Sequence, residues 1–278
     1  MLCFQLVKTV LDELYERLPY SSEFQKDQAI KEKLSYLGRA YENLRGGLQI
    51  DHADLTTRFA YIYKYVTCHA NLVYQTIQSA PPLQSLFNQQ KVKITCIGGG
   101  PGSEIIGILK YLLELRKSPK LRFNLYDREK RWGECWNDVD DKLDLPMEFN
   151  SHCEPMDVLV EADWGSNSKY LQSDLFSMVY FLSEIETKKK EATPFFENLF
   201  TNARAGSFFL FLDNGHTYYY EWFDQLIEGR GIDVLASAEE RTQIYDLDEQ
   251  KSDLEVYYEK FGYPKMRANI AYRICQKR

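Results

Sequence analysis

Hydrophobic residues recur at helical spacing from residue 1 to about residue 90, and no β-rich run bounded by turns interrupts that pattern. The first segment, MLCFQLVKTVLDELYERLP, carries a short apolar patch broken by Lys8 and Asp12, which predicts an amphipathic helix rather than a signal peptide. Pro81 and Pro82 are expected to end the helical region, because proline lacks a backbone donor and restricts the residue before it. The pattern therefore predicts a helical extension over residues 1–90.

From Val92 onward, short strand-like runs alternate with helical patterns, as a parallel sheet with crossover helices requires. Strands are expected at Val92–Ile97, Leu121–Tyr126, Met147–Met156, Ser177–Leu182, Ser207–Leu212, Ile232–Tyr245 and Asn269–Cys275. Helices are expected at Ser103–Arg116, Lys130–Asp141, Val158–Trp164, Ala192–Asn202 and Tyr218–Glu228. Residues 91–278 therefore form a predicted α/β domain.

The helical segment TTRFAYIYKYVTCHANLVYQTI carries two distinct stripes. The apolar stripe should pack against the domain core and contains Phe59, Ile62, Val66, Ala70, Val73 and Ile77. The second stripe contains Arg58, Tyr61, Tyr65, His69 and Leu72. Two interpretations of the second stripe stay open: a lid over a ligand pocket, or a second face of a helix that is packed on both sides.

Composition and charge limit the possible partners. The 278 residues carry a formal net charge of −7, which disfavours a broad nucleic-acid footprint but leaves room for a small basic rim. Six cysteines without a CxxC pair are typical of reduced thiols in a cytoplasmic or nuclear protein. The four histidines form no HxxxH or HExxH pair, and no stretch is long and apolar enough to cross a bilayer. Neither a metal nor a membrane is therefore expected as a partner.

The segment KVKITCIGGGPGSEIIGILKYLLE contains the most informative motif. Its four glycines, Gly98, Gly99, Gly100 and Gly102, lie between a predicted strand and a predicted helix, where missing side chains let a ligand approach backbone N–H groups. A tight turn that only needs positive φ is the alternative. Asp127 ends the next predicted strand about 25 residues later, where an acid reaches the ribose hydroxyls of an adenosine-type ligand or simply caps a helix.

The sequence ITCIGGGPGSE followed by NLYDRE resembles motifs I and II of class I S-adenosylmethionine-dependent methyltransferases, over roughly Val92 to Cys275. The resemblance implies a Rossmann-like sheet of seven strands, mostly parallel with an antiparallel last pair, flanked by helices. It also implies S-adenosylmethionine as the cofactor, with the glycine turn around its methionine and ribose parts and Asp127 on the ribose hydroxyls. One departure is Cys96, which stands where the family often has an acid for the methionine amino group; Glu104 could compensate indirectly or simply favour the helix N-terminus.

Later segments resemble the remaining motifs of the family in order. CEPMDVL resembles the end of strand three, which implies that Asp157 and Val158 bind the adenine, with a surface acid as the alternative. DLFSMVYFLSEIE resembles motif IV, which implies that its last residues, Phe181, Leu182, Ser183 and Glu184, face the methyl group and the substrate. Ser183 could instead cap the following helix.

Two further groups supply candidate side chains at the expected pocket. LDNGHTYYYEW places Asp213, Asn214, His216 and Tyr218 at the carboxyl edge of the sheet, where open α/β sheets bind ligands. Arg58 could hold the carboxylate of the cofactor or a polar substrate. The candidate catalytic residues are Tyr65, Ser183, Glu184 and His216, and the candidate cofactor residues are Gly98, Gly99, Gly100, Gly102, Asp127, Asp157, Val158 and Leu182.

The resemblance implies methyl transfer by in-line displacement, in which the protein mainly aligns the reacting groups. The acceptor is an RNA base, a protein or a small molecule, and YFLSEIE with the triple glycine is also similar to fungal uridine-N3 methyltransferases of ribosomal RNA. A non-catalytic S-adenosylmethionine sensor or scaffold is the first alternative, and would fill the space near Ser183 and Tyr65 that an enzyme keeps open. A nicotinamide-dependent oxidoreductase is the second alternative; it fits less well because Ser103 occupies the third glycine position of G-x-G-x-x-G.

Overall fold

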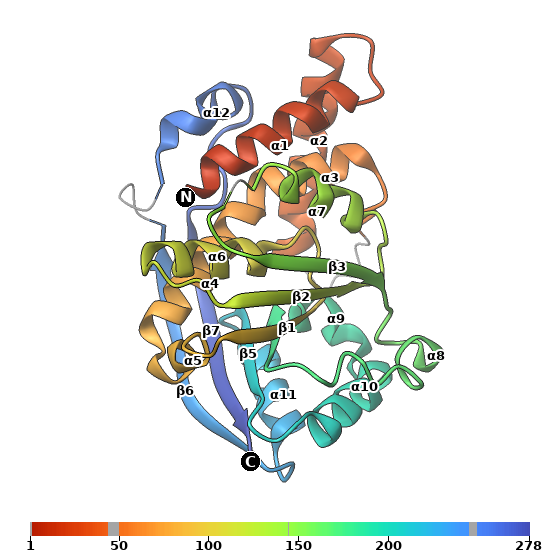
Figure 1. Cartoon of the computed structure of the whole chain (residues 1–278). Helices are drawn as coiled ribbons and strands as arrows, with labels where there is room; N and C mark the ends of the chain where they lie inside the picture. Colours follow the sequence, from red (N-terminus) through yellow and green to blue (C-terminus); the bar gives the residue numbers. More distant parts are fainter. Residues whose placement is uncertain (1, 44–49, 144, 245–248) are drawn as a thin grey trace.

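A computed structural model describes residues 2–43, 50–143, 145–244 and 249–278, and these residues form one mixed sheet covered by helices on both faces (Figure 1). The sheet has seven strands in the order β3-β2-β1-β4-β5-β7-β6. β1 to β5 pair in parallel, whereas β7 is antiparallel to both β5 and β6. The strands are β1 Lys91–Ile97, β2 Lys120–Asp127, β3 Phe149–Pro155, β4 Leu175–Val179, β5 Phe208–Asn214, β6 Ile232–Gln243 and β7 Arg267–Lys277. The predicted fold class is confirmed.

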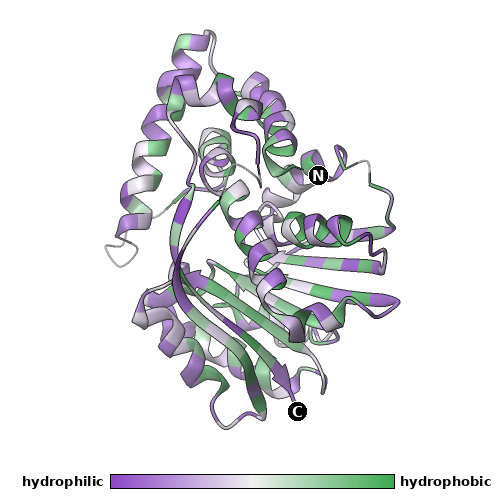
Figure 2. Ribbon diagram, turned by 90° about the vertical axis from the view of Figure 1, so that its left-hand side faces the viewer, coloured by the Kyte–Doolittle hydropathy of each residue, from purple (hydrophilic) through white to green (hydrophobic). Residues whose placement is uncertain are grey.

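Side chains alternate between two cores because successive residues of a strand point to opposite faces of the sheet. In β5, Leu210 and Leu212 join the core on one face, whereas Phe209 and Phe211 join the core on the other. The first core is covered by α1 Cys3–Arg17, α2 Glu23–Glu42, α4 Thr67–Ser79, α6 Ser103–Glu114 and α7 Trp132–Asp140, and the second by α8 Glu161–Trp164, α10 Lys189–Asn202 and α11 Thr217–Ile227. Figure 2 shows the hydrophobic colour concentrated on the strands between these layers.

The apolar stripe of the long N-terminal segment packs as predicted. Its residues lie on α3 Leu55–Tyr61, a π-helical turn at Ile62–Val66, and α4, and all six are at most 1% exposed. A Cβ on Gly107 would lie 2.4 Å from the carbonyl oxygen of Ala70, so α4 and α6 approach each other closely at this glycine. The π turn leaves backbone groups out of the regular ladder, and the carbonyl of Lys64 accepts a hydrogen bond from the N–H of Lys265 at 2.9 Å.

Several predicted boundaries are wrong, each for a local reason. Pro81 and Pro82 begin a helix, α5 Pro81–Leu86, instead of ending the helical region, because proline is well tolerated in a first helical turn. β4 ends at Val179 rather than Leu182, since Tyr180 has a φ of +54° and a short helix, α9 Leu182–Ile185, follows. The helix predicted at Val158–Trp164 is confined to Glu161–Trp164.

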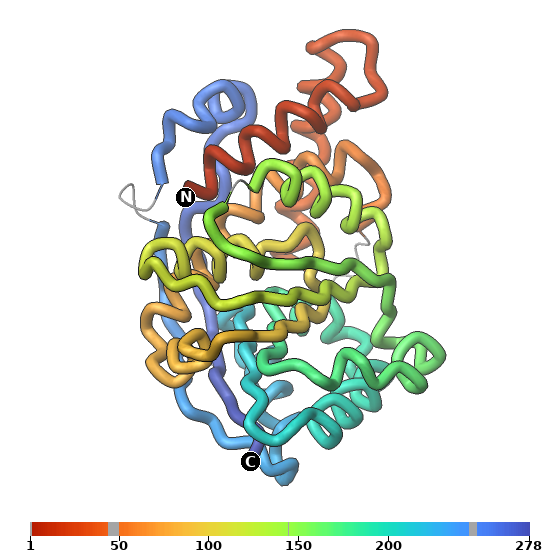
Figure 3. Tube along the Cα trace, viewed as in Figure 1, coloured from red at the N-terminus to blue at the C-terminus, as the bar shows by residue number. Residues whose placement is uncertain are grey.

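The sequence analysis also missed the helical segment between β6 and β7, which consists of a 3₁₀ turn at Lys251–Leu254 and α12 Glu255–Phe261. This segment returns to the N-terminal helices, and Figure 3 shows its trace beside the first helix of the chain. The Tyr257 hydroxyl donates a hydrogen bond to Asp12 at 2.6 Å, and Tyr63 donates one to the carbonyl of Gly262. Residues far apart in the sequence therefore build the upper part of the molecule together.

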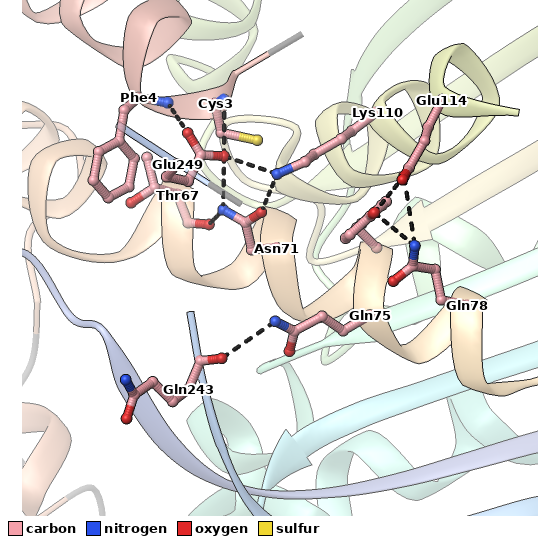
Figure 4. Close-up of polar contacts among 11 residues, drawn as sticks. Cys3, Phe4, Thr67, Asn71, Gln75, Gln78, Lys110, Glu114, Gln243 and Glu249 are labelled. Atoms are coloured by element: carbon pink, nitrogen blue, oxygen red, sulfur yellow. Dashed lines mark hydrogen bonds and ion pairs between the residues drawn. The ribbon is translucent and has the colours of Figure 1, made fainter. Parts of the chain in front are cut away.

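A buried polar cluster joins this segment to three helices (Figure 4). Glu249 is 1% exposed, and its carboxylate accepts hydrogen bonds from the backbone N–H groups of Cys3 and Phe4 at 3.0 and 2.8 Å. The same carboxylate accepts from Asn71 of α4 at 3.1 Å and forms an ion pair with Lys110 of α6 at 3.0 Å. Because the first N–H groups of a helix have no partner within it, Glu249 satisfies the start of α1 from the other end of the chain.

Candidate cofactor and active site

The glycine turn and Asp127 meet at the carboxyl ends of β1 and β2. The N–H groups of Gly98 and Gly99 donate to the carbonyl of Tyr126 at 2.8 and 3.2 Å, and the N–H of Gly100 donates to Asp127 Oδ2 at 3.1 Å. Asp127 is half-buried, and desolvation raises its pKa to about 6, although hydrogen bonds from the N–H groups of Glu129 and Gly100 oppose the rise. The two features on which the cofactor prediction depends therefore lie side by side.

The four glycines of the turn differ in how much space a side chain would have at each position. A Cβ on three of them would come within 3.0 Å of another side chain: Gly98 against Phe181, Gly99 against Cys96, and Gly102 against Trp136. At Gly100 the nearest atom to such a Cβ is the carbonyl oxygen of Gly98, at 4.0 Å. Packing thus accounts for three glycines, whereas Gly100 has a φ of +46° and open space on its bare face.

A cavity of about 350 Å³ lies at the ends of β2 and β3, and two of its lining residues directly follow Asp127 in the sequence. Its walls are Arg128 and Glu129 after β2, Pro155 at the end of β3 with Met156, Asp157 and Asp163 after it, and Ile50, Asp51 and His52 before α3. The predicted Asp157 therefore lines this cavity. The predicted Val158 is 5% exposed, and its carbonyl accepts a hydrogen bond from Trp164 Nε1 at 3.1 Å.

His52 was not among the candidate cofactor residues, because the sequence analysis considered this histidine only as a metal ligand. Its ring lies 5.4 Å from the ring of Tyr61 and 5.3 Å from that of Trp132, between centroids. Burial, and then the charge of Arg128, lower the pKa of His52 to about 4. The imidazole is therefore neutral at physiological pH and can act as a hydrogen-bond donor or acceptor in the cavity wall.

Glu184 is held by a residue that the sequence analysis did not single out. The hydroxyl of Tyr41, from α2, donates to Glu184 Oε1 at 2.9 Å, and the Tyr41 ring meets the Tyr65 ring edge-on with 4.9 Å between centroids. Tyr41 thus links two predicted catalytic residues. Glu184 is reached by solvent, yet desolvation raises its pKa to about 7, as do the charges of Asp127 and Asp213. The carboxyl therefore lies within electrostatic range of the acid beside the glycine turn.

The second stripe of the N-terminal segment forms an aromatic cluster beside Glu184. The His69 ring stacks on Tyr180 with 4.1 Å between centroids, and Tyr61 and Tyr65 lie 5.4 Å apart. Lys265 Nζ lies 4.6 Å from the centroid of Tyr180. Tyr180 is the residue with φ +54° at the end of β4, and such strain at a non-glycine residue is common at ligand sites.

Ser183 and Asp213 are brought together, as their places on neighbouring strand ends predict. The N–H of Ser183 donates to Asp213 Oδ2 at 2.9 Å, and Asn214 Nδ2 donates to the Ser183 hydroxyl at 3.2 Å. Asp213 is fully buried, and desolvation raises its pKa to about 6. Ser183 is 3% exposed, so its hydroxyl belongs to this buried set.

The other two candidates lie in different surroundings. His216 is exposed at the N-terminus of α11, where its Nδ1 accepts the N–H of Tyr218 at 3.4 Å and its ring stacks on the Tyr218 ring. Leu182 is fully buried in the second core. The structure thus gives His216 a helix-capping role and Leu182 a packing role, and groups Glu184 with Tyr65, and Ser183 with Asp213.

No protein-family model matches this sequence, and no curated protein matches it either. Among solved structures, the CurJ carbon methyltransferase is similar with a TM-score of 0.52 and 11% identity, over 92% of this chain and 68% of that chain. The fold is the class I methyltransferase fold. An S-adenosylmethionine-dependent methyltransferase from Clostridium acetobutylicum matches with a TM-score of 0.47 and 7% identity, over 87% and 98% of the two chains. The 16S rRNA methylase ArmA matches with a TM-score of 0.45 and 12% identity, over 88% and 98%.

The methyltransferase fold explains why these residues share one edge of the sheet. The strand order reverses between β1 and β4, so the loops that follow these two strands leave the sheet at its topological switch point. The glycine turn follows β1, and Tyr180 to Glu184 follow β4. Open α/β sheets bind ligands at such a switch point.

Arg58 is placed elsewhere than expected. Its Nη1 donates to the carbonyl of Arg131 at 2.9 Å and lies 3.6 Å from the carboxylate of Glu134 on α7. Arg58 is 4% exposed, so these contacts make it part of the packing between α3 and α7 rather than a group reserved for a ligand carboxylate.

The residues that the structure describes offer neither a metal site nor a membrane-spanning helix. No group of three or more histidine, cysteine, aspartate or glutamate side chains is suitably arranged to hold a metal ion there. No helix within the same ranges has the length and apolar character needed to cross a bilayer. All six cysteines lie in those ranges and are free thiols.

Proposed function

We propose that this protein binds S-adenosylmethionine at the glycine turn and transfers its methyl group to an acceptor beside Glu184. One observation carries the proposal: Gly100, which has open space on its bare face, donates its N–H to Asp127 at 3.1 Å on a methyltransferase fold. Asp127 would accept the ribose hydroxyls, and Asp157 with the backbone of Val158 would hold the adenine in the adjoining cavity.

The bound cofactor would supply an electrophilic methyl group on a sulfonium. The protein would align the acceptor with it, and alignment alone can lower such a barrier by roughly 7–11 kcal/mol in favourable cases. Glu184 is our candidate for the proton acceptor, because a carboxyl whose pKa is near 7 matches the removal of a proton from an N–H or O–H group at neutral pH. Tyr41 would orient that carboxylate through its 2.9 Å hydrogen bond.

The acceptor itself is proposed only as a class: an RNA base, a protein side chain or a small molecule bearing N–H or O–H. The similarity of YFLSEIE to uridine-N3 methyltransferases makes ribosomal RNA the first acceptor to test. Mass spectrometry of RNA, protein and metabolites from cells with and without this chain would identify the methylated product. The corresponding Glu184→Gln cells should lose the same modification if Glu184 is the base.

A second candidate function is a non-catalytic S-adenosylmethionine sensor. It is favoured by the burial of Ser183 and Tyr65 and by the packing of Tyr65 against Tyr41, since a sensor has no need of free space beside the methyl group. Thermal shifts with S-adenosylhomocysteine and NADH, followed by transfer of a labelled methyl group, distinguish the functions. Stabilisation by S-adenosylhomocysteine with transfer supports the enzyme, stabilisation without transfer supports the sensor, and stabilisation by NADH alone indicates an oxidoreductase.

A further inference from the structure

Glu104, the second residue of α6, is a buried carboxyl with one oxygen that has no hydrogen-bond partner among the described residues. The side chain is 2% exposed, and its Oε1 forms no hydrogen bond with any residue that the structure describes. α6 is 12 residues long and begins directly after Gly102, so Glu104 lies at the helix end that follows the glycine turn.

The described groups that act on the pKa of Glu104 carry no positive charge. Asp127 at the end of β2 raises the pKa of Glu104, while the charge of Glu104 in turn raises the pKa of Cys96 on β1 and of Tyr61 on α3. Besides desolvation and its own backbone N–H, no other described group shifts the pKa of Glu104. The described side chains that interact electrostatically with the carboxyl are thus an acid, a thiol and a phenol, and among the described groups the favourable field is that of the α6 N-terminus.

Burial without a cation is unfavourable for a carboxylate, because desolvation outweighs what a helix end returns. Desolvation raises the pKa of Glu104 to about 8, so the group is mostly protonated at neutral pH in the ligand-free protein. A buried acid with few hydrogen-bond donors is stabilised as an anion when a cation arrives with a ligand. The arrangement is therefore suited to a positively charged ligand group.

We propose that Glu104 receives the α-ammonium group of the cofactor's methionine part, in place of the strand-one acid that Cys96 replaces. This inference rests on the proposed function and adds a residue for the amino-acid tail of the ligand. It gives a role to a carboxyl that is buried near Gly102 without a described cation. Asp127 is left to the ribose, so the two acids divide the ligand between them.

Binding should then release a proton from Glu104. A group with a pKa of about 8 is roughly nine-tenths protonated at pH 7, and pairing with an ammonium group would ionise it. Affinity for a ligand with the amino-acid tail should rise with pH, by up to about tenfold per unit, until it levels off near pH 8. A ligand that lacks the tail should show neither effect through Glu104.

Calorimetric titration with S-adenosylhomocysteine and with 5′-methylthioadenosine tests the proposal, since the second ligand keeps the adenosine and sulfur but has no amino acid. In the wild type, titrations at pH 7 in buffers of different ionisation enthalpy should show close to one more proton released by S-adenosylhomocysteine. Glu104→Gln should abolish that difference and weaken S-adenosylhomocysteine by about 10- to 100-fold, while 5′-methylthioadenosine changes less than about twofold. As the matched control, Asp127→Asn should weaken both ligands.

Equal weakening of both ligands by Glu104→Gln would mean that Glu104 only supports the fold of the turn, and would overturn the proposal. So would equal proton release by the two ligands in the wild type, a measurement that needs no variant. If the wild type binds 5′-methylthioadenosine and S-adenosylhomocysteine with the same affinity, the Glu104 assignment fails while the proposed function stands. If it binds neither, both fail.

Discussion

Gly102 offers a quantitative test of the glycine turn. Its φ is +82°, and a Cβ added there would lie 2.2 Å from Cε3 of Trp136. Trp136 is fully buried, and its Nε1 donates to the hydroxyl of Ser151 at 2.7 Å, so the indole is held in place. Gly206 is the matched control: its φ is +85°, and no atom lies within 4 Å of the position that its Cβ would take.

The expected free-energy changes follow from these two environments. An alanine in the left-handed region costs about 1–2 kcal/mol, which is the whole effect expected for Gly206→Ala. Gly102→Ala adds overpacking against the fixed indole, which typically costs about 1–3 kcal/mol more. The free energy of unfolding should therefore fall by about 2–5 kcal/mol for Gly102→Ala.

Urea unfolding of both variants, followed by far-ultraviolet circular dichroism, measures these changes at equilibrium. A single cooperative transition with an unchanged m-value is required for the comparison. If Gly102→Ala is no more destabilising than Gly206→Ala, the indole of Trp136 does not fill the space beside Gly102, and the packing explanation for that glycine is wrong.

Two further predictions concern carboxylates. Glu249→Ala removes the acid at the centre of the buried polar cluster and should lower the free energy of unfolding by about 3–5 kcal/mol in urea. Glu148→Ala, which breaks an exposed ion pair of similar length, should change it by at most about 1 kcal/mol; equal effects would contradict the cluster. Methyl transfer should rise with pH to a plateau above about 7 as Glu184 ionises, and Tyr41→Phe should move that midpoint upward, because the Tyr41 hydrogen bond lowers the pKa of Glu184. A midpoint that Tyr41→Phe leaves in place, or lowers, in rate profiles would refute the assignment of Glu184 as the base.

Four acids with raised pKa values converge on the carboxyl edge of the sheet. Desolvation is the main cause in each case, and the values are about 8 for Glu104, 7 for Glu184, and 6 for both Asp127 and Asp213. Such clusters of shifted groups are typical of functional sites. A cationic ligand would relieve the mutual repulsion of these acids, and a sulfonium cofactor is such a ligand. This argument depends on the four acids together and not on any single residue.

The sequence was sufficient to predict the contact between the glycine turn and Asp127. Both follow predicted parallel strands, and the carboxyl ends of neighbouring parallel strands must meet at the same edge. Hydrophobic periodicity likewise located the strands, because strands buried on both faces read as short apolar runs. Local pattern and parallel topology together were enough for this half of the site.

The surroundings of Glu184, where we propose that the acceptor binds, could not be predicted in the same way. Tyr41 lies 143 residues from Glu184 in the sequence and sits on a helix whose pattern resembles that of any amphipathic surface helix. The left-handed conformation of Tyr180 has no sequence signal, since a bulky residue there goes against the usual preference. The roles of Glu249 and α12 depend on contacts made across the whole chain. These features arise from tertiary packing, and local propensity carries no information about them.

Calorimetric titration of the wild-type protein and Asp127→Ala with S-adenosylhomocysteine tests the central claim most directly, with the surface variant Asp141→Ala as the control of equal charge. The account predicts one binding site per chain in the wild type and in Asp141→Ala, and an affinity at least about tenfold weaker in a folded Asp127→Ala protein. The absence of binding to the wild type, or an unchanged affinity in Asp127→Ala, would contradict it.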